Sequence, residues 1–209
     1  MTKAFKYYIP GAKYWPGIFH VNTNQKVLFL TFDDGPTPQI TEWILALLKK
    51  YEAKATFFMV GKNVEKYPLL YQAIINEGHA VGNHTYSHVN GLKMFTSRYV
   101  AEVEKASQFI DSSLFRPPYG KLKPSQILRL RKKYKLIFWD FITRDFEAKL
   151  NVEESFSIIK DKTKRGSILV FHDSKKSEKQ MKELLPKVLE YFTKQGYIFR
   201  KIEMSLFNR

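Results

Sequence analysis

The chain has 209 residues, of which 44% are hydrophobic and 26% charged, and it contains no cysteine. This composition predicts one globular domain with a sizeable core, while the lack of cysteine excludes disulfide bonds, zinc–thiolate sites and a cysteine nucleophile. The formal charge of +15 raises the question of a nucleic-acid partner. We expect none, because the lysines are spread along the chain and no nucleic-acid-binding motif is present.

No apolar run is long enough for a transmembrane segment, and residues 1–11 lack the apolar stretch of a signal peptide. We therefore expect a cytoplasmic protein, or an extracytoplasmic one if an export signal was trimmed. We also expect a monomer. Residues 1–26 are interpreted as an irregular segment packed on the main body, and residues 27–209 as a single catalytic domain.

Apolar runs of strand length alternate with helical periodicity along the chain. Strands are predicted at residues 27–32, 54–60, 79–84, 114–115, 135–141, 167–171 and 197–202. Helices are predicted from Thr37 to Tyr51, at 64–77, from a cap at Thr96 or Ser97 to Ile110, at 124–133, from a cap at Asn151 onward and at 177–195. Strands that are apolar on both faces and alternate with helices predict a parallel α/β sheet covered by helices. This pattern allows either a closed barrel or an open, doubly wound sheet.

Ionisable side chains follow several of the predicted strands. At or just past the carboxyl ends of these strands lie Asp33, Asp34, His84, Arg116, Asp140 and His172. In parallel α/β folds this edge of the sheet carries the active site. The clustering therefore predicts an enzyme.

Two adjacent carboxylates, Asp33 and Asp34, end the first strand before Gly35-Pro36. Neighbouring side chains on an extended chain point to opposite sides, so one carboxylate can face a bound ion while the other faces a reacting group. The simpler interpretation is a strand that ends in an ordinary Asp-Gly turn.

His84 and His88 lie four positions apart, a spacing that places both imidazoles on one face of a helical turn. A metal site is the favoured interpretation, and two exposed loop histidines are the alternative. Thr85 occupies the glutamate position of the H-E-x-x-H metalloprotease motif, so that class is excluded. The third ligand would be Asp34 or Asp33. Two histidines and one carboxylate suit catalytic zinc, ferrous iron or another divalent metal.

Hydrolysis at such a metal also needs a base and an acid. The aspartate that does not bind the metal is the candidate base, and Arg116 is expected near the carboxylates. His172 is the candidate acid, with Asp145 as a partner that keeps it protonated. Without the other motifs, a structural strand-end histidine would be the better interpretation of His172. His20 and His79 are interpreted as structural.

Five ordered segments carry a resemblance to the polysaccharide deacetylases, the metal-dependent members of carbohydrate esterase family four. They are Thr31–Pro36 (TFDDGP), His84–His88 (HTYSH), Arg116–Gly120 (RPPYG), Trp139–Asp145 and Val170–His172. The resemblance runs from about residue 27 to 202. It implies a distorted (β/α)7–8 barrel that hydrolyses an N-acetyl or O-acetyl group on a sugar polymer.

The resemblance also implies a role for each site residue. The metal ligands would be Asp34, His84 and His88, and the metal Zn2+, with Co2+, Mn2+, Ni2+ or Fe2+ as alternatives. Asp33 would be the base steadied by Arg116, His172 the acid tuned by Asp145, and the Tyr119 backbone N–H a donor to the oxyanion.

Three positions depart from the family pattern. Phe146 replaces the usual tryptophan, Ile142 a common aspartate and Val170 the usual leucine. The resemblance implies that these positions shape the pocket for the acetyl methyl group, so the exact substrate stays open.

The implied activity is removal of acetyl groups from N-acetylglucosamine-containing glycans, such as peptidoglycan or chitin-like oligomers. One alternative is a hydrolase of cyclic or other non-sugar amides, and another is a non-catalytic glycan-binding module. The complete set of acid, base and ligands weakens the last alternative.

Overall fold

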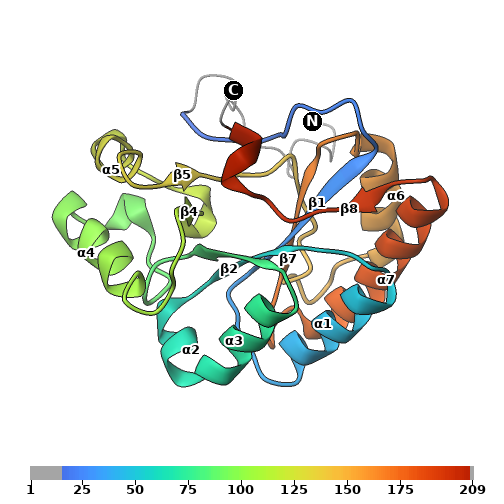
Figure 1. The fold of residues 1–209 in the computed structure, drawn as a ribbon, viewed down its shortest axis with the longest axis horizontal. Helices are drawn as coiled ribbons and strands as arrows, with labels where there is room; N and C mark the ends of the chain where they lie inside the picture. Colours follow the sequence, from blue (N-terminus) through green and yellow to red (C-terminus); the bar gives the residue numbers. More distant parts are fainter. Residues whose placement is uncertain (1–15, 208–209) are drawn as a thin grey trace.

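An eight-stranded parallel sheet forms the centre of the structure, a computed structural model that describes residues 16–207 (Figure 1). Seven strands follow the order β5-β4-β3-β2-β1-β7-β6, and β8 pairs with the start of β1. The strands are β1 Val27–Asp33, β2 Thr56–Met59, β3 Ala80–Asn83, β4 Leu114–Phe115, β5 Lys135–Leu136, β6 Phe141–Ile142, β7 Ile168–His172 and β8 Ile198–Phe199. All pairs between these strands are parallel.

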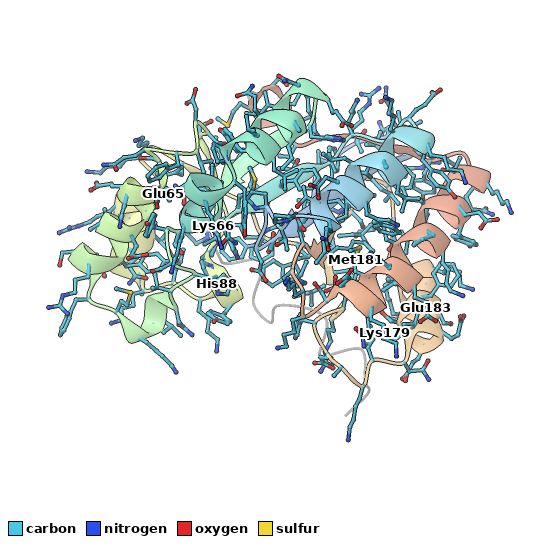
Figure 2. All side chains as sticks on the ribbon, turned by 90° about the horizontal axis from the view of Figure 1, so that it is seen from below. Glu65, Lys66, His88, Lys179, Met181 and Glu183 are labelled. Atoms are coloured by element: carbon cyan, nitrogen blue, oxygen red, sulfur yellow. The ribbon has the colours of Figure 1, made fainter. Side chains whose placement is uncertain are left out.

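Helices surround the sheet and bury one stripe of apolar residues each. They are α1 Ile40–Lys50, α2 Gly61–Lys66, α3 Pro68–Asn76, α4 Thr96–Ala106, α5 Pro124–Leu130, α6 Val152–Lys162 and α7 Glu178–Lys194. Figure 2 shows this amphipathic pattern on α7, where the buried Met181 faces inward while Lys179 and Glu183 point outward. None of the helices described between residues 16 and 207 is long and apolar enough to cross a membrane.

The segment between β5 and β6 joins the two edges of the sheet. We predicted one continuous strand at residues 135–141, and this prediction was wrong. The Ile137 N–H donates to the Phe115 carbonyl at one edge (2.9 Å), whereas the Asp140 N–H donates to the Ile168 carbonyl at the other (3.1 Å). Because each end of the segment pairs with a different edge, it curls the sheet into a distorted barrel. The predicted barrel class with outer helices is confirmed.

The alternation of side chains along β1 and β7 divides the core into two clusters. Leu28, Leu30 and Phe32 pack with the helices α1, α6 and α7. Val27 and Phe29 join a second cluster, together with Ile168 and Val170 of β7. Alternation places Asp33 and His172 at the end of this second face, on the inner side of the barrel.

Two predicted helix starts differ from the structure. Thr37-Pro38 was predicted to open the first helix, but α1 begins at Ile40, because the Thr37 hydroxyl donates to the Asp173 carbonyl instead of capping the helix. Thr96 or Ser97 was predicted as the cap of the helix that ends near Ile110, but both residues lie inside α4, whose N-cap is Phe95. The predicted cap at Asn151 is confirmed, since its side chain accepts the Glu154 N–H at 3.0 Å.

The segment predicted at residues 1–26 is described only from residue 16, and residues 1–15 lie outside the described part. Within it, Ile18 pairs with Ile137 and His20 with Ser167. The Phe19 ring stacks on Phe138 with ring centroids 4.6 Å apart. Ile18 and Phe19 thus lie along the segment that closes the barrel, whereas His20 lies against the residue that precedes β7.

Candidate active site

The carboxyl ends of β1, β3, β4 and β7 meet at one edge of the barrel and bring five of the six predicted strand-end residues together. In the sheet register Asp33 lies directly opposite His172. Asp140 is the exception, because its carboxylate contacts His20 Nδ1 (3.0 Å) and accepts the backbone N–H of Ile168 (3.0 Å). Ile168 begins β7, so Asp140 lies at the amino ends of the strands, away from the site. Its predicted place beside the other strand-end residues was wrong.

Arg116 binds Asp33 inside the barrel. Its Nη1 donates to Asp33 Oδ1 and to Thr31 Oγ1, both at 2.7 Å, and the guanidinium is fully buried. The Phe58 ring covers the guanidinium at 4.1 Å. Burial lowers the pKa of Arg116, and the charge of Asp33 opposes that shift. The ion pair orients the side chain of Asp33.

The backbone turns at Asp34, with φ of 82°, and this turn directs its carboxylate to the two histidines. His88 Nε2 lies 3.1 Å and His84 Nε2 3.7 Å from Asp34 Oδ1. One ligand atom from each of the three residues falls within 4.8 Å of the others. Asp33 and Asp34 therefore face different partners, as predicted from their adjacent positions. The reason differs from the prediction, because Asp34 is not in an extended conformation.

The protonation of His84 shows that this cluster fits a metal cation. His84 Nδ1 donates to the Arg116 carbonyl at 2.7 Å, and burial lowers the pKa of His84 to about 4. Its Nε2 therefore carries a lone pair that faces a carboxylate. Asp34 Oδ1 is buried and receives no hydrogen bond of good geometry from any described residue. A cation between these atoms would relieve both features.

The pKa of Asp34 also favours cation binding. Burial alone would raise it, but the contact with His88 and the nearby imidazoles of His172 and His84 lower the pKa below its usual range. Asp34 therefore stays a carboxylate, the form that a metal binds.

The histidine pair does not lie on a helical turn, and that part of the prediction was wrong. Thr85 and His88 have φ of 65° and 56°, so the segment is an irregular loop. Asn83, at the end of β3, shapes this loop because its Oδ1 accepts the Thr85 N–H at 2.9 Å. The two rings still lie 5.1 Å apart between centroids.

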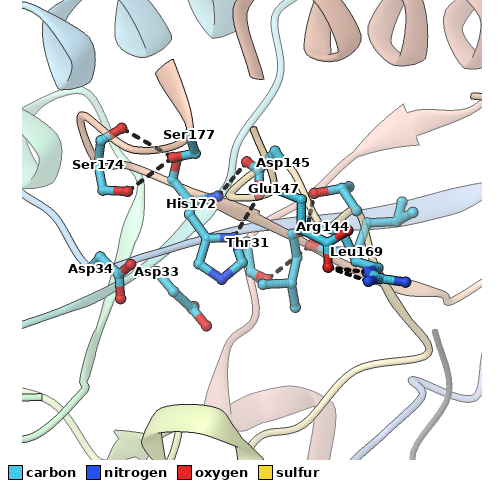
Figure 3. A network of polar contacts seen from close by, with 12 residues as sticks. Thr31, Asp33, Asp34, Arg144, Asp145, Glu147, Leu169, His172, Ser174 and Ser177 are labelled. Carbon is cyan, nitrogen blue, oxygen red and sulfur yellow. Dashed lines mark hydrogen bonds and ion pairs between the residues drawn. The ribbon is translucent and has the colours of Figure 1, made fainter. Parts of the chain in front are cut away.

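His172 is bound twice by Asp145. Its Nδ1 lies 2.7 Å from Asp145 Oδ1, and its backbone N–H donates to Oδ2 at 2.8 Å. Burial alone would lower the pKa of His172, but the charge of Asp145, with Asp34 and Asp33, raises it to about 9. Figure 3 shows the ring between Asp145 on one side and the two aspartates on the other. His172 is thus an imidazolium near neutral pH, and its Nε2 carries a proton.

Tyr119 and Phe146 flank the two sides of the site. The Tyr119 ring meets His88 edge-on at 4.9 Å between centroids, and its backbone has φ of 62°. Phe146 meets His172 in the same way at 4.9 Å. Val170 is fully buried in the inner cluster, with Ile142 packed against it. The role of the Tyr119 N–H stays a prediction.

Sequence reasoning missed two residues that support the site. Asn63 donates to the Asp34 carbonyl at 2.8 Å. Asp173 is fully buried, and its Oδ2 accepts a hydrogen bond from Thr41 at 2.6 Å. Burial raises the pKa of Asp173 to about 8, although the Thr41 bond opposes the shift. The only signal in the sequence was the position of Asp173 directly after His172.

Comparison with known proteins places this site in a family. The family model described as polysaccharide deacetylase matches residues 20–138. The chain belongs to the polysaccharide deacetylase family. It is 32% identical over 189 residues to a peptidoglycan-N-acetylglucosamine deacetylase of Bacillus cereus, an alignment that covers 87% of this chain and 88% of that protein. It is 32% identical to a chitooligosaccharide deacetylase of Azorhizobium caulinodans, covering 73% and 76% of the two chains.

Solved structures of the family share the fold. A peptidoglycan N-acetylglucosamine deacetylase superposes with a TM-score of 0.85 and 27% identity, covering 93% of this chain and 95% of that one. The family also includes a pseudoenzyme, whose mutant with restored activity superposes with a TM-score of 0.80 and 25% identity over 92% and 72% of the chains. The predicted enzyme class, a polysaccharide deacetylase, is confirmed by the family match and the named relatives, and the individual side chains of the site bear on its mechanism.

Proposed function

We propose that this protein is a metal-dependent deacetylase that hydrolyses N-acetyl groups on N-acetylglucosamine-containing glycans, such as peptidoglycan or chitin-like oligomers. The observation that carries the proposal is the separation of two adjacent carboxylates. Asp33 is bound by Arg116, whereas Asp34 faces the lone pair of His84. The names of the similar proteins support the same substrate class.

Asp34, His84 and His88 would hold the metal. A bound divalent cation would supply Lewis-acid activation of water and of the acetyl carbonyl. Two histidines and one carboxylate leave open positions and favour Zn2+, while Co2+, Mn2+, Ni2+ and Fe2+ also accept these ligands.

The proton transfers then belong to Asp33 and His172. Asp33 accepts a proton from the attacking water, and Arg116 binds and orients its carboxylate for this step. The water oxygen adds to the acetyl carbon, and the backbone N–H of Tyr119 donates to the oxygen that gains charge. As the C–N bond breaks, His172 Nε2 gives its proton to the departing nitrogen. Asp145 stabilises the imidazolium until that step.

A hollow beside the site suits a neighbouring sugar of a longer glycan. Its volume is about 290 Å³, close to the lower end of about 300 Å³ for small-molecule sites. It lies between the loop after β1, the α2–α3 junction and the loop after β7, and it is lined by Pro36, Thr37, Pro38, Gln39, Asn63, Tyr67 and Lys175. Room for a further sugar beside the site supports a glycan substrate over a small cyclic amide.

Acetate release tests the proposal directly. The purified protein, loaded with Zn2+, is incubated with N-acetylglucosamine oligomers and with peptidoglycan fragments, each with and without a chelator. We expect release that stops on chelation and returns with added metal. Release that survives chelation would contradict the metal mechanism. No release from any acetylated glycan would favour an amide hydrolase or a binding module.

A further inference from the structure

Asp173 is a buried carboxyl that no step of the proposed reaction uses. Its side chain is fully buried, and its Oδ1 receives no hydrogen bond from any residue that the structure describes. Leaving a polar atom in this state costs free energy, so its retention needs a physical reason. The contacts of the remaining Asp173 atoms give one.

Asp173 ties the end of β7 to the end of β1 and to the loop that follows it. The Asp173 N–H donates to the Asp33 carbonyl at 2.7 Å. The Thr37 hydroxyl donates to the Asp173 carbonyl at 2.8 Å. A second connection runs through Thr41, whose hydroxyl accepts the Thr37 N–H (2.8 Å) and donates to Asp173 Oδ2 (2.6 Å). Both ends of Asp34–Thr37 are therefore held by Asp173.

The carboxyl of Asp173 also fills the space beside Gly35. A Cβ added to Gly35 would lie 2.2 Å from Asp173 Oδ2 and 2.8 Å from Cγ, far inside contact distance. Gly35 cannot easily move away, because its carbonyl accepts the Val60 N–H at 3.0 Å. Gly35 directly follows Asp34 in the chain. The Asp173 side chain, packed as a wall against Gly35, therefore restricts the backbone at Asp34 and with it the position of the Asp34 carboxylate.

We propose that Asp173 is a positioning residue that sets the place of Asp34 relative to His84 and His88 by packing against Gly35 and binding Thr37. The inference rests on the proposed function in one respect, namely that Asp34 binds a metal. It assigns Asp173 no contact with substrate. Outer partners of this kind typically change metal affinity or activity by about 10- to 100-fold when removed.

The test is a double-substitution cycle at Asp173 and Gly35, in which metal affinity is measured separately from activity. The variants are Asp173→Ala, Asp173→Asn, Gly35→Ala and the double variant Gly35→Ala/Asp173→Ala. Asp161→Ala on the exposed surface of α6 serves as the matched aspartate control. For each variant, the dissociation constant for Zn2+ is measured by chelator competition, and the thermal unfolding of the metal-free protein is recorded.

We expect Asp173→Ala to weaken Zn2+ binding by about 10- to 100-fold, and Asp173→Asn, which keeps the shape and an acceptor for Thr41, to restore most of it. Gly35→Ala should weaken binding strongly when Asp173 is present and much less in the Asp173→Ala background, where the wall is gone. Neighbouring residues that share a contact give such non-additive effects.

Two results would overturn the inference. One is Asp173→Ala with a lower unfolding temperature but unchanged Zn2+ affinity, which would mean a purely structural role. The other is an equal cost of Gly35→Ala in both backgrounds. Failure of the proposed function is distinguishable, because a wild-type protein that binds Zn2+ but releases no acetate from any glycan leaves both affinity comparisons intact.

Discussion

Arg116 donates to Asp33 from 2.7 Å and, with its other two nitrogens, to the carbonyls of Ile137 (3.3 Å) and Phe138 (2.9 Å). Ile137 and Phe138 belong to the segment that joins the two edges of the sheet. One buried side chain therefore orients the candidate base and fastens the closure of the barrel. The orientation of Asp33 and the closure of the barrel therefore depend on the same side chain.

Substitution of Arg116 by Met should destabilise the protein strongly. It leaves Asp33 buried without its partner and two carbonyls without their donor, and removal of one member of a buried ion pair costs about 3–5 kcal/mol. Urea unfolding measures the change. Arg129→Met on the exposed face of α5 is the control and should change stability little. A loss below about 1 kcal/mol for Arg116→Met would mean that the pair contributes no more than a surface salt bridge.

Exchange of each aspartate for asparagine should separate the base from the metal ligand. Asp33→Asn removes the proton acceptor, and we expect turnover to fall by about 100- to 10,000-fold while metal content stays at the wild-type level. Asp34→Asn removes a charged ligand and should lose the metal. Metal analysis and acetate release on the two purified variants check this. Loss of metal from both would show that the two roles are not separate.

Removal of the metal should lower the free energy of unfolding of the wild type. It should leave the free energy of unfolding of His84→Ala unchanged. A ligand present at 100 times its dissociation constant stabilises the folded state by about 2.7 kcal/mol. Thermal unfolding with chelator and with Zn2+ measures the shift. His20→Ala, at the opposite edge of the sheet, should keep the full shift. A Zn2+ shift that persists in His84→Ala would place the cation elsewhere.

The paired His172 predicts how stability and activity depend on pH. Its folded pKa of about 9 lies above the unfolded value of 6.5. Its contribution is therefore complete below pH 6.5 and is lost as pH rises toward 9. Asp145→Asn removes the largest raising charge, so the variant should lose less stability over this range. Urea unfolding of the metal-free protein between pH 6 and about 9 measures it.

The same substitution should move the activity profile. A general acid works only while protonated, so the alkaline limb of turnover should shift to lower pH in Asp145→Asn. Asp161→Asn on exposed α6 provides a control whose profile should match the wild type. An unshifted alkaline limb in Asp145→Asn would remove His172 from the role of acid.

His84 and His79 predict an opposite slope at acid pH. Burial lowers the pKa of each to about 4, below the unfolded value of 6.5. The unfolded chain therefore binds more protons, and stability should fall as pH drops from 6.5 toward 4. In the metal-free protein, His84→Gln should flatten this slope in part, because His79 remains. A slope that His84→Gln leaves unchanged would mean that His84 is protonated in the folded state.

Much of the site could be predicted from local sequence because its chemistry is carried by short segments at strand ends. The alternation along β1 predicted different partners for Asp33 and Asp34. The positions of Arg116 and His172 at predicted strand ends placed them on the same side of the sheet as Asp33. The ordered motifs carried the family resemblance, and their residues lie together in the structure.

The failures came from features that depend on distant parts of the chain. Residues 135–141 have the composition of one strand, yet the two ends of this segment pair with different strands. Its first part pairs with β4 and its last part with β7. Asp140 was predicted at the carboxyl end of a strand but lies at the amino ends of the strands, because it binds Ile168 and His20 there. The spacing of His84 and His88 suggested a helix, whereas Asn83 and positive φ angles shape a loop.

The sequence by itself determined the alternation of strands and helices, the side of β1 from which Asp33 projects, and the set of acid, base and ligand side chains, because these follow from local periodicity and residue type. The tertiary structure decided how the barrel closes, which histidine atoms face Asp34, and that Asp173 stands against Gly35. These features are set by pairing and packing between segments more than 100 residues apart in the chain, such as Gly35 and Asp173, and local pattern carries no record of such contacts.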